Sequence, residues 1–183
     1  MASGSGNGKI KLWTLKIFII TIITSAGISV ICELFLANMG LVPAVLVVLF
    51  LIFMGVFFDI IGVAFASCDQ KPFIAMSSRK IKKARRALKL LKNAEVVSNV
   101  CNDVIGDICG IVSGAAGAAI VLKIVSAAQS LSEIVISIGV SSLIAAFTVA
   151  GKALGKGFAM RNNVKIVEGI GSFLAFFERD KKK

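Results

Sequence analysis

The sequence predicts an all-α membrane protein with four transmembrane helices, cytoplasmic amphipathic helices and both termini inside the cell. Three observations predict this fold class: 57% of the 183 residues are hydrophobic, only 17% are charged, and the apolar residues are grouped in long blocks. Soluble domains are typically about 45–50% apolar and about 25% charged. The composition therefore excludes an ordinary soluble enzyme and a disordered regulator.

Four apolar blocks are each long enough to cross the membrane as a helix, which needs about 20 residues. They cover residues 12–37, 41–67, 96–122 and 131–150. The expected organisation is a flexible tail over 1–10, a four-span domain over 11–157, and an interfacial helix with a basic tail over 158–183. The first block could be a secretory signal, but it is longer than the usual signal core, so an uncleaved anchor is favoured.

The basic residues account for the net charge of +11 and lie mostly between the second and third spans and after the fourth. Basic residues in loops beside spans stay on the cytoplasmic side. The pattern therefore predicts a multi-pass protein of the inner (plasma) membrane with both termini inside. The positive charge then serves topology and contact with the lipid bilayer, and nucleic acid is not an expected partner.

The segment 77–93 is predicted to be a basic amphipathic helix, with Ser77 or Ser78 at its N-cap and Asn93 at its C-terminus. It is either a solvated helix or a helix that lies on anionic lipid, and lipid contact is favoured over nucleic acid because no aromatic residue interleaves with the charges. The expected membrane-surface residues are Arg79, Lys80, Lys82, Lys83, Arg85 and Arg86.

The segment from Phe158 onward has a broad apolar face but too many charges at its start for a fifth span. An interfacial helix, or one packed beneath the other helices, is expected there. A fifth crossing would also place Lys181–Lys183 outside the cell.

Acidic and amide side chains inside the predicted spans are the most informative feature. Asp59 lies in the second span, and Asn102, Asp103 and Asp107 lie in the third. Polar residues inside spans are costly and often line a pathway. Oxygen ligands without histidine suit a hard cation such as Mg²⁺. The alternative is that the acids lie near the interface and pair with Lys92 or Lys152.

Small residues are spaced along 98–117, with Gly106, Gly110 and Gly114 in overlapping small-xxx-small motifs. Such motifs allow another helix to approach closely. The expected partner at this stripe is a second copy of the chain, or another membrane protein.

No catalytic constellation is visible. The chain has no histidine and no tyrosine, and its four cysteines, which match no zinc spacing, are Cys32, Cys68, Cys101 and Cys109. We expect no enzyme.

The order of motifs resembles the membrane domain of the cyclin M / CorC magnesium-transporter family. The resemblance rests on residues 57–64, the basic helix ending at 88–93, the pair at 102–103 and the motif at 151–156. It covers about residues 44–178. It implies a homodimer of short-helix bundles, with a cytoplasm-facing cavity that binds dehydrated Mg²⁺.

The resemblance also carries residue roles and departures. By position, Asp59 replaces a serine of the family, Asn102 keeps the first asparagine of a pair, and Asp103 replaces the second. Lys156 keeps the motif lysine. The departures are Gly62 and Lys152 where the family has glutamate and Gly155 where it has proline, and the nucleotide-sensing domains of larger members are not expected here.

Three functions remain open. The first is binding or transport of a divalent cation, Mg²⁺, through Asp59, Asn102, Asp103 and Asp107. The alternative is a non-transporting scaffold or subunit of a membrane complex, in which Lys152 or Lys156 blocks the ion site or pairs with the acids. A third possibility is lipid binding by the two amphipathic helices.

Overall fold

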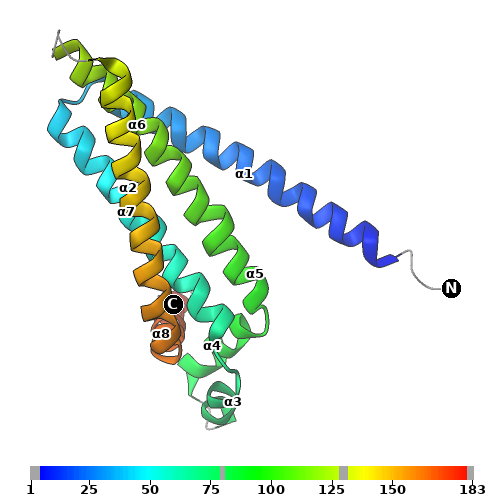
Figure 1. The fold of residues 1–183 in the computed structure, drawn as a ribbon. Helices are drawn as coiled ribbons and strands as arrows, with labels where there is room; N and C mark the ends of the chain where they lie inside the picture. Colours follow the sequence, from blue (N-terminus) through cyan, green and yellow to red (C-terminus); the bar gives the residue numbers. More distant parts are fainter. Residues whose placement is uncertain (1–4, 79–80, 128–131, 181–183) are drawn as a thin grey trace. The chain divides into compact units, whose positions relative to one another are not determined.

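The computed structural model describes residues 5–78, 81–127 and 132–180, and this part of the chain is helical with no strand. The helices are numbered along the chain in Figure 1. Their bounds are α1 (Ser5–Ala37), α2 (Leu41–Ser67), α3 (Lys71–Ser78), α4 (Lys82–Leu91), α5 (Ala94–Asn99), the π-helix η1 (Val100–Gly106), α6 (Asp107–Ala127), α7 (Glu133–Arg161) and α8 (Asn163–Asp180).

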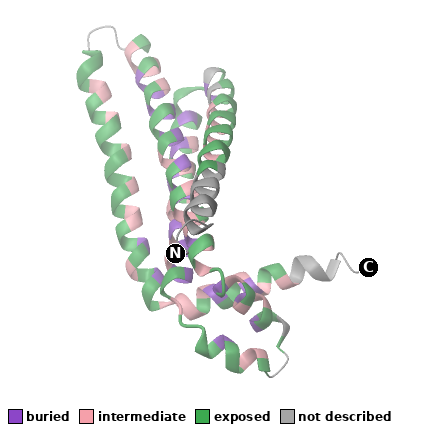
Figure 2. Ribbon diagram, turned by 90° about the vertical axis from the view of Figure 1, so that its right-hand side faces the viewer, coloured by how far each residue is buried: buried purple, intermediate pink, exposed green. Residues whose placement is uncertain are grey.

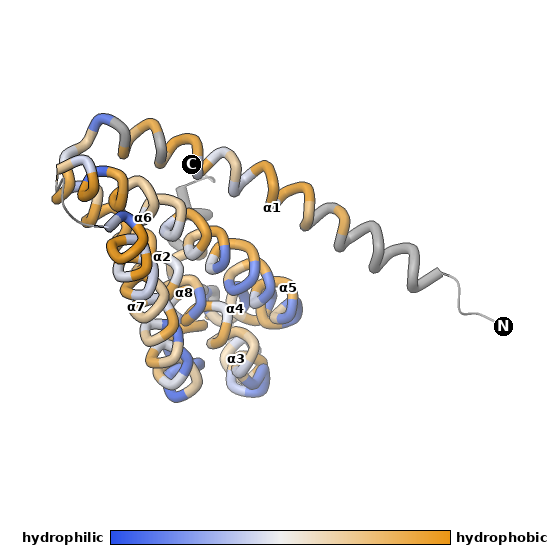
Figure 3. Tube along the Cα trace, turned by 45° about the horizontal axis from the view of Figure 1, so that its top comes forward, coloured by the Kyte–Doolittle hydropathy of each residue, from blue (hydrophilic) through white to orange (hydrophobic). Residues whose placement is uncertain are grey.

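Four helical segments are long and apolar enough to cross a membrane: Phe18–Leu36, Leu41–Ser67, Ala94–Ala127 and Glu133–Arg161. Hydrophobic residues run along most of α2 and along the coloured part of α1, and hydrophilic residues also occur on the short helix α3 (Figure 3). The all-helical class and the four predicted spans are therefore confirmed by length and composition, and the chain is assigned to a membrane.

The chain divides into two compact units. The first comprises Met1–Ile52 and Asp107–Ala146, and the second comprises Phe53–Gly106 and Phe147–Lys183. The long helices α2 and α7 each contribute residues to both. Each unit has its own apolar core.

In the first unit, α1 packs against α6. The core contains Leu36 of α1, Ala44, Val48 and Ile52 of α2, and Ala116 and Ile120 of α6. At one end of α1 the ammonium group of Lys123 donates a hydrogen bond to the Met39 carbonyl. This bond satisfies a backbone acceptor in the Asn38–Gly40 turn, where α1 ends.

In the second unit, the short helices α3, α4 and α8 pack around the end of α2. Four large side chains in this core are at most 1% exposed: Phe65, Phe73, Leu91 and Val167. Two side-chain hydrogen bonds tie the segments together: Gln70 Nε2 donates to the Leu91 carbonyl at 3.1 Å, and Asn163 Nδ2 donates to the Ser67 carbonyl at 2.9 Å.

The basic segment is two helices and not one. Ser77 and Ser78 are the last residues of α3, and α4 begins after Ile81, whose side chain cannot cap a helix. The predicted N-cap was therefore wrong. At the other end, the Asn93 backbone N–H donates to the Leu90 carbonyl, and Asn93 then precedes α5.

The predicted apolar face of the basic helix is largely confirmed. Ala84 and Leu91 are buried and Leu88 packs against the core, whereas Ile81 is exposed. Figure 2 shows the alternation of buried and exposed residues on these short helices.

The helices at the two ends of the chain have bounds that differ from the predicted ones. Helix α1 begins at Ser5, so residues 5–10 are helical where a tail was expected, and residues 1–4 lie outside the described part. Helix α7 continues to Arg161, and α8 starts at Asn163 instead of near Phe158. Residues 181–183 are not described.

Glycines provide the closest helix contacts. In the predicted small-residue stripe, a Cβ on Gly117 would collide with Ile144 Cδ1 of α7. No described atom lies within 4 Å of a Cβ added at Gly110 or Gly114. In the second unit, a Cβ on Gly151 would lie 2.7 Å from Val56 Cγ2, and one on Gly155 would lie 2.8 Å from Ile60 Cγ1. The pair on α7 therefore receives two side chains of α2 that are one turn apart.

Helix α8 meets α4 at Gly171, and a substitution there tests the packing. A Cβ would lie 2.9 Å from both Ala87 Cβ and the Lys83 carbonyl oxygen. The backbone of α4 would have to move to relieve this overlap. Gly171→Ala is expected to destabilise this contact by about 1–3 kcal/mol, seen as a lower unfolding midpoint and faster amide exchange in α4.

Gly169→Ala is the matched control, because no described atom lies within 4 Å of its Cβ position. Alanine in a helix interior is favoured over glycine by about 0.8–1 kcal/mol, so this variant should be neutral or stabilised. Equal behaviour of the two variants would contradict the α4–α8 packing.

Candidate functional site

Asp59 is the only acidic residue among the buried polar residues of the described chain, with 4% of its surface exposed. It lies in α2, which has only apolar residues and glycine on either side of it for a full turn. Burial of an unpaired charge in such surroundings is expensive. The carboxylate therefore requires a partner.

Asn102 lies in η1 and packs against Gly62, one turn beyond Asp59 on α2. A Cβ on Gly62 would collide with the Asn102 Oδ1 and would lie 2.6 Å from its Cγ. The absence of a side chain at Gly62 therefore creates the space that the Asn102 amide fills. The other end of the amide, Nδ2, donates to Ser98 Oγ at 3.3 Å.

The segment that carries Asn102 has one buried side. Ser98, Asn102 and Gly106 are four residues apart, and Ser98 and Gly106 are buried. Ser98 belongs to α5, and the other two residues belong to the π-helix η1. Such segments are frequent at functional sites.

Two acceptor oxygens at this place have no donor. Asp59 Oδ2 and Asn102 Oδ1 are both buried and make no hydrogen bond to any described group. Leaving a buried acceptor unsatisfied costs about 1–3 kcal/mol, and more for a charged group. The two helices thus present a pair of oxygens that suits a cation, a hydrated cation or an ordered water.

Further atoms of the second unit gather near Gly106, four residues after Asn102. A Cβ on Gly106 would lie 3.8 Å from the Gly55 carbonyl oxygen and 3.8 Å from Lys152 Nζ. Gly55 precedes Asp59 by one turn of α2. An ammonium group and a backbone carbonyl therefore lie close to the helix that carries the amide.

The other two predicted acids are at the surface of the chain. Asp103 is exposed, although it follows Asn102 directly. Asp107 is exposed as well, has an interaction of its own, and belongs to the first compact unit. Among the residues that the structure describes, no three histidine, cysteine, aspartate or glutamate side chains form a metal-binding group. The buried candidate site is thus Asp59 with Asn102.

The predicted surface residues divide into described and undescribed ones. Lys83 and Arg85 are exposed, and Arg86 is partly buried. Arg79 and Lys80 lie outside the described residues, and only the backbone of Lys82 is described. Lys156 on α7 is exposed.

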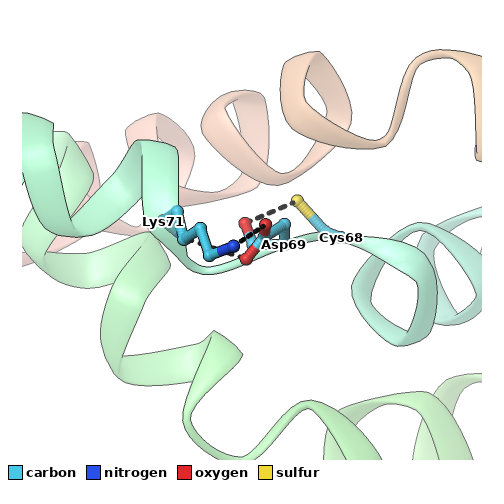
Figure 4. Close-up of polar contacts among 3 residues, drawn as sticks. All are labelled: Cys68, Asp69 and Lys71. Carbon is cyan, nitrogen blue, oxygen red and sulfur yellow. Dashed lines mark hydrogen bonds and ion pairs between the residues drawn. The ribbon is translucent and has the colours of Figure 1, made fainter.

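The connection from α2 to α3 carries Cys68, directly after the span in α2. Figure 4 shows Asp69 between Cys68 and Lys71: the Cys68 thiol donates to the Asp69 carbonyl at 3.6 Å, and Lys71 Nζ lies 4.0 Å from Asp69 Oδ2. The Lys71 backbone N–H donates to Asp69 Oδ1 at 3.0 Å, which caps α3. Burial, and then the Asp69 charge, raise the pKa of Cys68, so its reactive thiolate is scarcer at neutral pH.

Three contributors to the site were not predicted as site residues. Ser98 has a polar side chain at an ordinary position in a span, and Gly55 contributes only backbone. Gly62 stood out only as a departure from the family motif. Its role depends on the helix that faces it, which no local pattern of the sequence contains.

Comparison of the chain with protein-family models, with curated proteins and with solved structures finds no significant match. The resemblance to the cyclin M / CorC family therefore stays a prediction.

A substitution at Gly62 tests the geometry of the site. Gly62→Ala should force the Asn102 amide out of its position, because the new Cβ would occupy the place of Oδ1. We expect a loss of stability of about 1–3 kcal/mol and faster amide exchange over residues 98–106.

Gly110→Ala serves as the control for this substitution, since no described atom lies within 4 Å of its Cβ position. It should leave exchange over residues 98–106 unchanged. If Gly62→Ala behaves in the same way as the control, Asn102 does not pack against Gly62.

Proposed function

We propose that this chain is a multi-pass membrane protein that binds and moves a divalent cation, with Mg²⁺ as the preferred cargo. The observation that carries the proposal is the pair of buried acceptor oxygens without donors, Asp59 Oδ2 and Asn102 Oδ1. The basic residues on α4 and after α7 support an orientation with both termini inside, in the inner (plasma) membrane.

The chemistry of the donor set favours a hard cation. Mg²⁺ takes oxygen ligands, keeps several of its waters and is often held by only one or two carboxylates. A hydrated ion would satisfy both orphan acceptors, because its waters donate hydrogen bonds to oxygen. Asp59 supplies the charge, Asn102 the neutral acceptor, and Ser98 fixes the orientation of the amide through Nδ2.

The exposed acids have a separate part in the proposal. Asp103 follows Asn102 and lies at the surface of the chain, where a carboxylate can attract a cation before it reaches the buried oxygens. Asp107 lies one turn further along the chain, and in this proposal it too attracts the cation at the surface. A homodimer with its contact at residues 98–117 would cover these acids with a second copy.

The alternative function is a scaffold or subunit of a membrane complex that moves no ion. The position of Lys152 favours it, because an ammonium group near Gly106 and the Gly55 carbonyl can neutralise an acidic region without a metal. In that case a stoichiometric protein partner should co-purify with the chain, and Lys152→Ala should reduce its stability.

Flux into proteoliposomes tests the transport proposal. Wild-type protein should carry Mg²⁺ into vesicles that contain a Mg²⁺-sensitive dye, and Asp59→Asn should slow the initial rate by at least about tenfold. This corresponds to the loss of one charge-assisted interaction of about 1.5–3 kcal/mol.

Asp69→Asn is the charge-matched control, because it removes one carboxylate from the exposed α2–α3 connection. Its rate should equal that of the wild type, and Asp103→Asn and Asp107→Asn should raise the Mg²⁺ concentration at half-maximal rate. No flux with wild-type protein, or an unchanged rate in Asp59→Asn, refutes transport through this site.

A further inference from the structure

The exposed arc of α4 is strongly basic. Lys83, Arg85 and Lys89 on this helix are exposed, as is Lys92 directly after it. Within α4 five of the ten residues are basic and none is acidic. We call these four exposed residues the basic face of α4. None of the four forms an ion pair within 4.0 Å with a described residue.

The opposite side of α4 is fixed in the core, so the basic face cannot turn inward. Ala84, Ala87 and Leu91 are at most 2% exposed. The contact of Gly171 with Ala87 and the Lys83 carbonyl holds α8 directly against this side. The orientation of the charges is therefore set by packing and not by the side chains themselves.

Helix α4 ends beside the end of the span in α2, because Gln70, which follows that span, donates to the Leu91 carbonyl. Asn163, the first residue of α8, donates to the carbonyl of Ser67, the last residue of the span in α2. Helix α8 then runs across the direction of α7, at the end of that helix (Figures 1 and 2). Since α2 has 27 residues, it is about 40 Å long, which exceeds the hydrocarbon core of about 30 Å. Its end therefore reaches the lipid headgroups.

Exposed apolar side chains accompany these charges. Ile74 on α3 is 53% exposed, Phe173 on α8 is 61% exposed, and Ile81 and Leu174 are exposed as well. A helix that lies in the membrane interface combines basic residues with apolar ones in this way.

We propose that the basic face of α4 binds the anionic headgroups of the bilayer in which the protein is embedded, and so selects anionic lipid at the rim of the spans. The ligand chemistry is a phosphodiester headgroup with net negative charge. Nucleic acid has the same charge, but α4 offers no aromatic side chain for base stacking, and its connection to the span ends keeps it at the bilayer surface.

Lipid binding to the full chain in detergent micelles tests this proposal. The probes are fluorescent phosphatidylglycerol and fluorescent phosphatidylcholine with the same acyl chains. Wild-type protein should bind phosphatidylglycerol more tightly. The variant Lys83→Gln/Arg85→Gln/Lys89→Gln should lose at least about tenfold of that affinity, since each basic residue at the surface contributes measurably, and should bind phosphatidylcholine as before.

The matched control is Lys83→Arg/Arg85→Lys/Lys89→Arg, which keeps every charge and should keep the wild-type preference. Sodium chloride provides a test that needs no variant: the wild-type affinity for phosphatidylglycerol should fall as salt rises, because the charges are exposed and screened.

Three results would overturn the proposal. These are equal wild-type affinity for the two lipids, unchanged phosphatidylglycerol binding in the glutamine variant, and an affinity that does not respond to salt. Tighter binding of a 20-nucleotide RNA than of phosphatidylglycerol, lost in the same glutamine variant, would assign the basic face to nucleic acid instead.

Discussion

A carboxylate that is taken out of water needs a compensating partner, and the second unit is organised around this requirement at Asp59. The residue lies among apolar neighbours of α2, and the helix that faces it offers an amide oxygen instead of a donor. Gly62 permits that approach, and Ser98 holds the amide with its oxygen on the inner side. Each of these buried acceptors has an unfavourable energy unless a cation or a hydrogen-bond donor satisfies it. The cation proposal follows from this requirement and does not depend on the resemblance to a transporter family.

The same physical device, a glycine where a neighbour must come close, recurs throughout the second unit. Gly151 and Gly155 receive Val56 and Ile60, and Gly171 receives the backbone of α4. Inside a membrane, helices gain little from hydrophobic burial against one another, so close packing at small residues has more weight. At Gly171 the contact also sets which side of α4 is turned outward, and so where its lysines and arginines lie.

Much of the fold could be predicted from composition, because a long apolar run has few alternatives to a membrane helix. The bounds 41–67 of the second span agree with α2. Of the predicted intramembrane acids Asp59, Asp103 and Asp107, Asp59 is buried and the other two are exposed. The local sequence pattern did not predict which polar side chains are buried or where the basic helix begins, because these depend on backbone geometry and on contacts with other helices. Asn102 is partly buried while Asp103 and Asp107 are exposed, whereas the regular α-helix that the sequence predicts places all three on one stripe. The segment Val100–Gly106 is a π-helix instead. The start of α4 after Ile81 could not be predicted either, because Ile81 has no side-chain group that caps a helix.

The central claim is that the oxygens of Asp59 and Asn102 share a cation. Manganese is a suitable probe, since it takes the same oxygen ligands as magnesium and scatters X-rays anomalously. Crystals of the full chain grown in lipid with Mn²⁺ should show an anomalous peak between Asp59 Oδ2 and Asn102 Oδ1, at ligand or water-bridged distance from both, and crystals of Asp59→Asn should lack it. The account is contradicted if wild-type crystals show no anomalous peak there and the Lys152 ammonium group instead donates directly to the Asp59 carboxylate.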